Sequence, residues 1–523
     1  MIRMRSANFK PPEPTDSVPA GWPLVVRRWH TAASMAARCS TPFALLHALA
    51  VLSLGPAFTG NVEAAGAGAA LPPKVAASLA AAGIPLSGVA AFVQEVGAPK
   101  PLLAFNAAQA MNPASTMKLV TTYAALELLG PTFVWRTEAY ASGSLSGDAL
   151  EGDLVLRGTG DPKLTIENFW VLLRALRARG LREIRGDLVL DRAYFEPIGD
   201  EPARFDGEPF RPYNVSPDAL LLNFKTVRFT FSPDPDRQGV RVVAEPRPVQ
   251  LELAQSVRLA EGPCGDWRGR LKADFPPING AARVSFSGPY PASCGEQSWN
   301  VALLPHDAYV YGVFRQLWEE MGGALKGGFR EGTPGPGARL LYAIESPQLA
   351  EVVRDINKFS NNVMARQLFL TLSAEVLKLP GNAARSSGVI RSWLAQKPLV
   401  FPELAMENGS GLSRRERISA EHLGKLLLAA WHSPVMPEFI ASMPLAANDG
   451  TMRRRLNLDS VAGHVHVKTG TLADARTAAG YVLDLTGRRL AIVFFINHAN
   501  AAAGEVAQDA FLRWVFEGAG APQ

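Results

Sequence analysis

Apolar and polar positions alternate in different ways along the 523 residues of this chain, and the changes mark out its elements. Residues 88–105 predict two strands joined by a tight turn. Residues 111–131 predict a helix that Asn112 can cap, with Pro113 at its first position and Gly130 at its end. Because this helix is apolar on nearly every side, we expect it to be buried at the centre of a domain.

The pattern is different between residues 146 and 330. Short runs of β-forming residues alternate there with Pro, Gly and Asp turns, and one helix is predicted near residues 165–180. This segment therefore predicts one or two mainly β modules.

Helical patterning returns over residues 346–373, where Ser346 can cap the first helix. A strand pair near residues 463–485, a strongly apolar strand at 488–498 and a last helix near 503–517 follow. The order of strands, helix, long insertion, helices, strands and helix predicts one α/β domain that both ends of the chain build together. We place this domain at residues 65–145 and 331–523, the insert at 146–330 and a leader at 1–64.

The leader has the pattern of an export signal. Residues 43–54 are apolar, and residues 62–64 place small side chains at the spacing of a cleavage site. The apolar run is shorter than the roughly 20 residues that a membrane-spanning helix needs. We therefore predict a cleaved signal peptide and a periplasmic protein that meets the membrane only through that peptide. An uncleaved membrane anchor is the alternative, and Met35 is a candidate for the true start of translation.

Composition and charge narrow the class of protein. Hydrophobic residues make up 47% of the chain and charged residues 19%, as in an ordinary globular protein with a large core. The formal net charge is +5, but several basic residues lie in the leader, and no stretch combines clustered Lys and Arg with aromatic residues. We therefore predict no nucleic-acid partner.

The chain has three cysteines, of which Cys39 lies in the leader. Cys264 and Cys294 remain as an even pair in an exported protein, which favours a disulfide within the insert. Two buried free thiols are the alternative.

The first candidate for chemistry is the pair Ser115 and Lys118 in the predicted central helix. Positions three apart share a helix face, so the hydroxyl and the amine project together. Free N–H groups in the first turn favour negative charge at Ser115, and an apolar surrounding lowers the pKa of Lys118 so that it can act as a base. The alternative, for this pattern alone, is a helix-terminal Ser and a Lys that reaches solvent.

Two further motifs follow in the chain. Ser360-Asn361-Asn362 lies between two helical runs, and Lys468-Thr469-Gly470-Thr471 lies on a predicted strand whose Gly470 leaves room for a substrate peptide at the strand edge. Each motif alone is weak. Their occurrence in this order, Ser-x-x-Lys, Ser-x-Asn and Lys-Thr-Gly, is the signature of penicillin-recognising serine enzymes.

Neighbouring segments make the signature more specific. Residues 408–414 (NGSGLSR), 444–451 (PLAANDGT) and 160–162 (GDP) resemble segments of one family, the D-alanyl-D-alanine carboxypeptidases/endopeptidases of the low-molecular-mass class C penicillin-binding proteins, which are DacB-like serine peptidases. The resemblance extends over nearly the whole chain after the leader. It implies an α/β fold, with a penicillin-binding-protein/β-lactamase-like transpeptidase domain of antiparallel sheet and helices, interrupted by a large, mainly β insert.

The resemblance also implies a covalent acyl-transfer cycle. Ser115 would attack the carbonyl between two D-residues while Lys118 takes its proton. Ser360 and Lys468 would relay a proton to the leaving amine, and Asn362 would hold the amide on the acyl side of the substrate.

Other residues are implied as substrate contacts. The backbone N–H groups of Ser115 and Thr471 would form the oxyanion hole. Lys468, Thr469 and Thr471 would face the terminal carboxylate of the substrate, beside Gly470.

Arg414 and Asp161 are implied contacts to the diamino-acid side chain of the wall peptide. The chain departs from the family at two places. Asn408 stands where relatives often have Asp, which puts the role of that carboxylate in question, and Ala473 is small where relatives can carry a longer polar residue.

The implied substrates are peptidoglycan peptides, and β-lactam antibiotics are implied covalent inhibitors. We expect no cofactor and no metal: His464 and His466 alternate on one strand face, but no third ligand lies near them in the sequence.

Two alternative functions stay open. A β-lactamase would share the fold and the acylation step, but the Glu-x-x-Leu-Asn segment that activates water in class A enzymes does not follow Ser360. A non-catalytic wall-binding protein would keep the fold without the chemistry.

Overall fold

The computed structural model describes residues 70–198, 202–234, 236, 239–275, 281–457 and 460–519. The predicted signal peptide and the candidate start at Met35 lie outside the described residues. All described residues belong to one compact unit, Ala64–Gln523. Within this part of the chain, no helix is both long enough and apolar enough to cross a bilayer.

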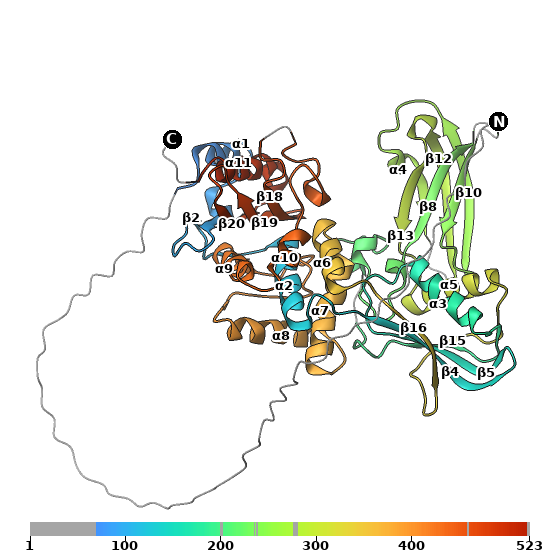
Figure 1. Ribbon diagram of the computed structural model, residues 1–523. Coiled ribbons are helices and arrows are strands. Elements are labelled where there is room, and N and C mark those ends of the chain that lie inside the picture. The colour runs from blue at the N-terminus through green and yellow to red at the C-terminus, as the bar shows by residue number, and fades with distance from the viewer. Residues whose placement is uncertain are drawn as a thin grey trace, which may run out of the picture. The chain divides into compact units, whose positions relative to one another are not determined.

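A five-stranded antiparallel sheet unites the first and the last described strands (Figure 1). In spatial order its strands are β18 (Val465–Leu472), β19 (Ala475–Leu483), β20 (Arg489–Asn497), β1 (Val89–Glu95) and β2 (Leu103–Phe105). The pairs β1–β2 and β18–β19 confirm the two predicted strand pairs. Because β20 pairs with both β19 and β1, strands from the two ends of the chain form one sheet.

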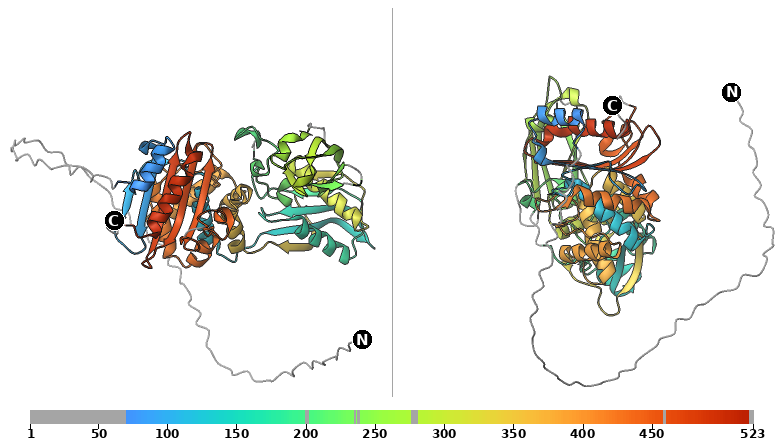
Figure 2. Two further views of the ribbon diagram at one scale, coloured as in Figure 1. Left: turned by 90° about the horizontal axis from the view of Figure 1, so that it is seen from above. Right: turned by 90° about the vertical axis from the view of Figure 1, so that its left-hand side faces the viewer.

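Helices cover both faces of this sheet. On one face α1 (Pro73–Ala81) and α11 (Glu505–Phe516) lie side by side (Figure 2) and share an apolar core with the strands. On the other face α9 (Ala420–Trp431) packs against β1 and β20 and adjoins the larger core around α2 (Lys118–Leu129). The helix α2 is buried along most of its length, which confirms the predicted central helix.

The first turn of the central helix differs from the prediction. Residues Ala114–Met117 form a 3₁₀ turn, and the α-helix begins only at Lys118. The reason is Ala114, whose φ of 46° breaks helical geometry directly after Pro113. Asn112 still satisfies a backbone donor, because its Oδ1 accepts from the N–H of Ala114 at 2.9 Å. Ser115 therefore lies in a tight turn ahead of the helix.

Two helices flank the second motif. α6 (Leu349–Lys358) and α7 (Asn362–Leu377) are separated by a turn in which Ser360 has a φ of 55°. The predicted cap at Ser346 is wrong, because Gln348 is the residue before α6, and Ser346 Oγ instead accepts from the N–H of Trp135 and donates to the Pro347 carbonyl oxygen. The remaining helices of this region are α8 (Ala383–Gln396) and α10 (Met436–Ser442), and β3 (Ala110–Met111) pairs with β17 (Ile418–Ser419).

The strands between Arg136 and Glu345 form two further sheets. The six-stranded sheet has the order β11 (Lys272–Asp274), β12 (Ala282–Pro291), β10 (Leu251–Ala260), β9 (Gly239–Glu245), β8 (Val227–Asp234) and β13 (Gln297–Val301). The seven-stranded sheet has the order β14 (Ala324–Leu325), β6 (Glu183–Ile184), β5 (Ala149–Gly158), β4 (Arg136–Ser146) and β16 (Arg339–Glu345), and β7 (Leu188–Asp191) pairs with β5 and with β15 (Phe329–Glu331).

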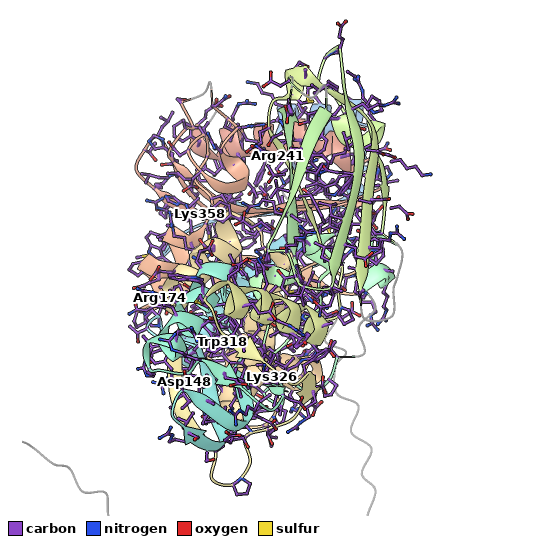
Figure 3. The ribbon with its side chains drawn as sticks, turned by 90° about the vertical axis from the view of Figure 1, so that its right-hand side faces the viewer. Asp148, Arg174, Arg241, Trp318, Lys326 and Lys358 are labelled. Atoms are coloured by element: carbon purple, nitrogen blue, oxygen red, sulfur yellow. A yellow bond between two sulfur atoms is a disulfide. The ribbon has the colours of Figure 1, made fainter. Side chains whose placement is uncertain are left out.

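One apolar core joins these two sheets with α3 (Ile166–Ala178) and α5 (His306–Glu320). Trp318 of α5, labelled in Figure 3, is fully buried in this core and stacks on Phe314. A disulfide joins Cys264, just before the short helix α4 (Trp267–Arg270), to Cys294 in the 3₁₀ turn that follows β12.

Candidate active site

Lys118 lies at the centre of a hydrogen-bonded cluster. The residue is completely buried, and its Nζ donates to Ser115 Oγ at 3.1 Å. The same nitrogen donates to Asn362 Oδ1 at 2.6 Å and to the Ser410 carbonyl oxygen at 2.5 Å. Burial lowers the pKa of Lys118 to about 7, although the negative charge of Glu416 opposes that shift. An amine with this pKa can accept a proton near neutral pH.

Ser360 and Lys468 form a second pair beside the first. Lys468 Nζ donates to Ser360 Oγ at 2.8 Å and to the carbonyl oxygen of Thr469 at 2.6 Å. Burial lowers the pKa of Lys468 well below its usual range, and the positive charge of Lys118 lowers it further. Two lysines that disfavour each other's charge are a means of keeping one of them neutral.

The strand that carries Lys468 is the edge of the five-stranded sheet. At Gly470 this edge lies so close to the turn Ala114–Met117 that an added Cβ would stand 2.7 Å from the Ser115 backbone nitrogen. On the neighbouring strand, Thr477 Oγ1 donates to the Pro113 carbonyl oxygen at 2.8 Å and ties the turn to the sheet. A strand edge beside a serine hydroxyl is suited to an extended peptide that adds to the sheet.

The three motifs thus meet in one place, although Ser115 and Lys468 lie far apart in the sequence. They line a cleft of about 370 Å³ that continues past the edge strand toward α11. In the cleft, Thr451 Oγ1 lies 2.7 Å from Thr469 Oγ1, so two hydroxyl groups sit together beyond the strand edge. The lining residues are Ser115, Ser360, Asn362, Thr451, Arg455, Thr469, Gly470, Thr471, Arg476, Glu505 and Gln508.

Arg414 lies in a neighbouring cavity of about 510 Å³. Its guanidinium carbon is 5.2 Å from the ring centre of Phe205, and its Nη1 bonds Asp474 Oδ1 at 3.0 Å. Because both side chains of this ion pair are at least half exposed, an anionic group of a ligand can compete for Arg414.

Asp161 lines neither cavity. It is 4% exposed, and its Oδ1 accepts from the backbone N–H of Lys163 at 2.7 Å. Burial raises the pKa of this carboxyl to about 7. The geometry therefore does not bring Asp161 together with the other candidate residues.

His464 lies just before β18 and has ordinary packing partners. His464 Nδ1 bonds the Ala462 carbonyl oxygen at 2.9 Å, and its ring packs on Phe516. In the part of the chain that the structure describes, no group of three or more His, Cys, Asp or Glu side chains could hold a metal ion.

Sequence reasoning missed several residues of the site. Ser410 lies in the NGSGLSR segment, and nothing in that segment indicates that its carbonyl oxygen is a partner of Lys118. Glu416 stands in an Arg-rich stretch that is typical of an exposed loop, and nothing in that stretch indicates that its carboxylate is buried. Arg455 and Arg476 lie outside the three motifs. Arg476 reaches the cleft because it lies opposite Thr471 in the β18–β19 pair, and Arg455 bonds Gln508 and Asp509 of α11.

A serine bonded to a buried lysine, with a second serine–lysine pair on the edge of an antiparallel sheet, defines the class of penicillin-recognising serine enzymes. Comparison of the sequence with protein families gives the particular family. The chain belongs to the D-Ala-D-Ala carboxypeptidase 3 (S13) family, whose model matches residues 71–517. This membership confirms the predicted family and the predicted enzyme class, a serine-type carboxypeptidase.

Individual relatives are consistent with this family membership. A D-alanyl-D-alanine carboxypeptidase of Actinomadura sp. (strain R39) is 29% identical over 429 residues, which cover 78% of this chain and 77% of the relative. The D-alanyl-D-alanine carboxypeptidase DacB of Haemophilus influenzae is 24% identical over 395 residues, covering 75% of this chain and 82% of the relative. The crystal structure of penicillin binding protein 4 (dacB) from Haemophilus influenzae superposes with a TM-score of 0.71 at 22% identity, covering 84% of this chain and 98% of that one. The structural likeness confirms the predicted fold class.

Proposed function

We propose that the protein is a serine-type D-alanyl-D-alanine carboxypeptidase of the periplasm that also cuts D,D cross-links as an endopeptidase. The observation that carries the proposal is the bond from Lys118 Nζ to Ser115 Oγ, made by a buried amine with a pKa of about 7. The family and the carboxypeptidase relatives support the substrate class.

In the first half of the cycle, Ser115 Oγ bonds to the carbonyl carbon of the penultimate D-alanine, and its proton passes to Lys118. The backbone N–H groups of Ser115 and Thr471 stabilise the oxyanion, at roughly 3 to 4 kcal/mol per donor. Ser360 and Lys468 pass the proton that Lys118 has taken on to the leaving amine, so that Lys118 is neutral again, the C–N bond breaks, and an acyl-serine remains. In the second half, water attacks this ester, its proton returns through Lys118, and Ser115 is regenerated.

The substrate peptide is proposed to bind as an extra strand along β18. Its terminal carboxylate would meet the hydroxyls of Thr469 and Thr471, and its diamino-acid side chain would enter the cavity that Arg414 and Phe205 line. The assignment of Asp161 to the same side chain has no support from its buried position.

We also propose that the α/β domain and the insert are separate folding modules, and that the leader exports the chain. The insert sheets have their own core, distinct from the core around α2.

Covalent labelling tests the function. The purified protein without its leader is incubated with benzylpenicillin, beside a Ser115→Ala variant, and both are analysed by intact mass. We expect an adduct of the mass of penicillin on the wild type and none on the variant. Absence of an adduct on a folded wild type would favour the non-catalytic wall-binding alternative.

Product analysis then separates the activities. A pentapeptide ending in D-alanyl-D-alanine should lose one D-alanine, and cross-linked muropeptide dimers should be converted to monomers. Rapid turnover of penicillin, with neither peptide substrate cut, would instead identify a β-lactamase.

A further inference from the structure

Glu416 is a fully buried carboxylate that belongs to none of the three motifs. It lies at the end of the loop that contains the Gly-Ser-Gly segment, and it binds that loop from within. Its Oε1 accepts from three backbone N–H groups and its Oε2 from a fourth, at 2.8 to 3.1 Å. The four donors are Glu407, Asn408 and Gly409 on Oε1 and Gly411 on Oε2.

These bonds favour the ionised form of Glu416. A carboxylate is an acceptor on both oxygens, whereas a protonated carboxyl would direct its own O–H toward N–H donors. Burial raises the pKa of Glu416, while the N–H groups and the positive charge of Lys118 lower it. Hydrogen bonds from the loop therefore replace part of the hydration that the Glu416 carboxylate loses when it is buried.

One peptide unit connects Glu416 to Lys118. In a trans peptide the N–H and the C=O point in opposite directions. In the unit between Ser410 and Gly411, the N–H donates to Glu416 Oε2 at 2.9 Å and the C=O accepts from Lys118 Nζ at 2.5 Å. The neighbouring Gly409 carbonyl oxygen accepts from Thr121 Oγ1 of α2 at 2.6 Å. Glu416 therefore holds the loop in the orientation that directs its carbonyl groups at α2.

The Ser410 carbonyl matters because of the hydrogen count on Lys118. A neutral amine has two hydrogens and one lone pair. If Asn362 Oδ1 and the Ser410 carbonyl oxygen take the two hydrogens, the lone pair is left for Ser115 Oγ, the third partner of Nζ. Both carbonyl oxygens have to be in place for this orientation.

We infer that Glu416 is a positioning residue for acylation. By binding the N–H of Gly411, it keeps the Ser410 carbonyl oxygen within hydrogen-bond distance of Lys118 Nζ, so that the amine lone pair faces Ser115. The inference rests on the proposed function.

Asn408 fits the same loop as an amide, because its Nδ2 donates to the Leu412 carbonyl oxygen and its Oδ1 accepts from the N–H of Ser410. A carboxylate at position 408 could not make the first of these bonds, and the loop carries its buried charge at Glu416 instead.

The test combines a rate with a pH profile. Glu416→Gln replaces one acceptor oxygen by an N–H₂ group that opposes a backbone N–H, so the Ser410 carbonyl shifts. We expect acylation by a fluorescent penicillin to slow by about 10- to 100-fold. The charged groups that act on the pKa of Lys118 and Lys468 are Glu416 and the two lysines themselves. Because Glu416 raises the pKa of Lys118, its removal should also move the midpoint of the acylation profile to lower pH.

Two variants serve as controls. Glu403→Gln removes another mostly buried carboxylate that accepts a backbone N–H, that of Ser419, but that contacts none of the residues around Lys118. It should keep the wild-type acylation rate and midpoint. Glu416→Asp keeps the negative charge on a shorter side chain, so it should acylate slowly while its midpoint stays near that of the wild type.

The possible results distinguish failure of the positioning role of Glu416 from failure of the proposed function. If folded Glu416→Gln acylates at the wild-type rate, or slows without a change of midpoint, the inference is wrong. Should Glu416→Gln not fold, Glu416→Asp decides, since an unchanged acylation rate there would overturn the positioning role. If the wild type itself forms no adduct, the proposed function fails first, and the inference fails with it.

Discussion

At the scale of single residues, the environment of Lys118 makes a prediction about pH. Its pKa is about 7 because burial disfavours the charged form. Below that pH, Lys118 is an ammonium whose three hydrogens occupy its three acceptors, and no lone pair is left for the Ser115 proton. The rate of acylation should therefore fall about tenfold for each pH unit below 7 and level off above it.

Stopped-flow measurement of acylation by a fluorescent penicillin, over a pH range of about 5.5 to 8.5, checks this expectation. A Lys118→Arg variant is the companion, because a guanidinium stays protonated throughout this range. It should show no acylation at any of these pH values. A wild-type rate that is independent of pH would contradict the role of Lys118 as the base.

The residues that the sequence could identify are those whose spacing carries the chemistry. Ser115 and Lys118 are three positions apart, and their meeting requires only one turn of local structure. Glu416 could not be identified in this way, because its role depends on a buried loop whose polar sequence is typical of a surface. Asp161 shows the reverse: a short motif match indicated a contact, but the side chain is buried away from both cavities.

At the scale of elements, the close approach of β18 to the turn Ala114–Met117 leads to the next prediction. An added Cβ at Gly470 would lie 2.7 Å from the Ser115 backbone nitrogen and 2.3 Å from Thr477 Oγ1. In a Gly470→Ala variant the strand edge has to move away from the turn. We expect acylation to drop by about 100-fold, because the proposed oxyanion donors, the N–H groups of Ser115 and Thr471, lose their alignment.

Gly388→Ala is the matched control, since Gly388 lies in α8 and nothing stands within 4 Å of an added Cβ. That variant should acylate like the wild type and unfold at an equal or slightly higher temperature. Intact-mass time courses with penicillin measure both variants. Equal acylation rates for the Gly470 and Gly388 variants would mean that acylation does not depend on the close approach of β18 to the Ser115 backbone.

The elements themselves were predictable where their periodicity is strong, as for β18, β19, β20 and α11. The predictions are wrong where a special backbone conformation or a distant partner overrides the local pattern. Ala114 has a positive φ that residue preferences alone do not reveal, and it converts the expected first helical turn into a 3₁₀ turn. At Ser346 the hydroxyl is used by Trp135, a partner more than 200 positions away that no local pattern specifies.

At the scale of the whole molecule, two of the apolar cores in the described part of the chain are formed by different segments. One surrounds α2, and the other joins the two sheets between Arg136 and Glu345. The pairing of the two chain ends in one sheet was predictable from element order. The arrangement of the insert as two sheets was not, because its short strands give no indication of which strands pair.

The disulfide between Cys264 and Cys294 gives a prediction about the independence of these cores. It closes a loop with a sequence separation of 30 inside the six-stranded region, far from Ser115 in the chain. Replacing both cysteines by Ala should destabilise the insert by roughly 3 to 4 kcal/mol, since the unfolded loop regains its freedom. The acylation rate should stay unchanged, because none of the residues around Lys118 contacts this loop.

Two measurements on the double variant separate the possibilities. Near-ultraviolet circular dichroism during urea unfolding follows the aromatic cluster of Trp267, Trp299 and Phe286 next to the disulfide, and penicillin labelling at each urea concentration follows the active site. If the insert is a separate module, its transition moves to lower urea while loss of labelling keeps the wild-type midpoint. If both transitions move together, the two cores unfold as one cooperative unit, and the insert has to be regarded as part of the scaffold that holds Lys118 in place.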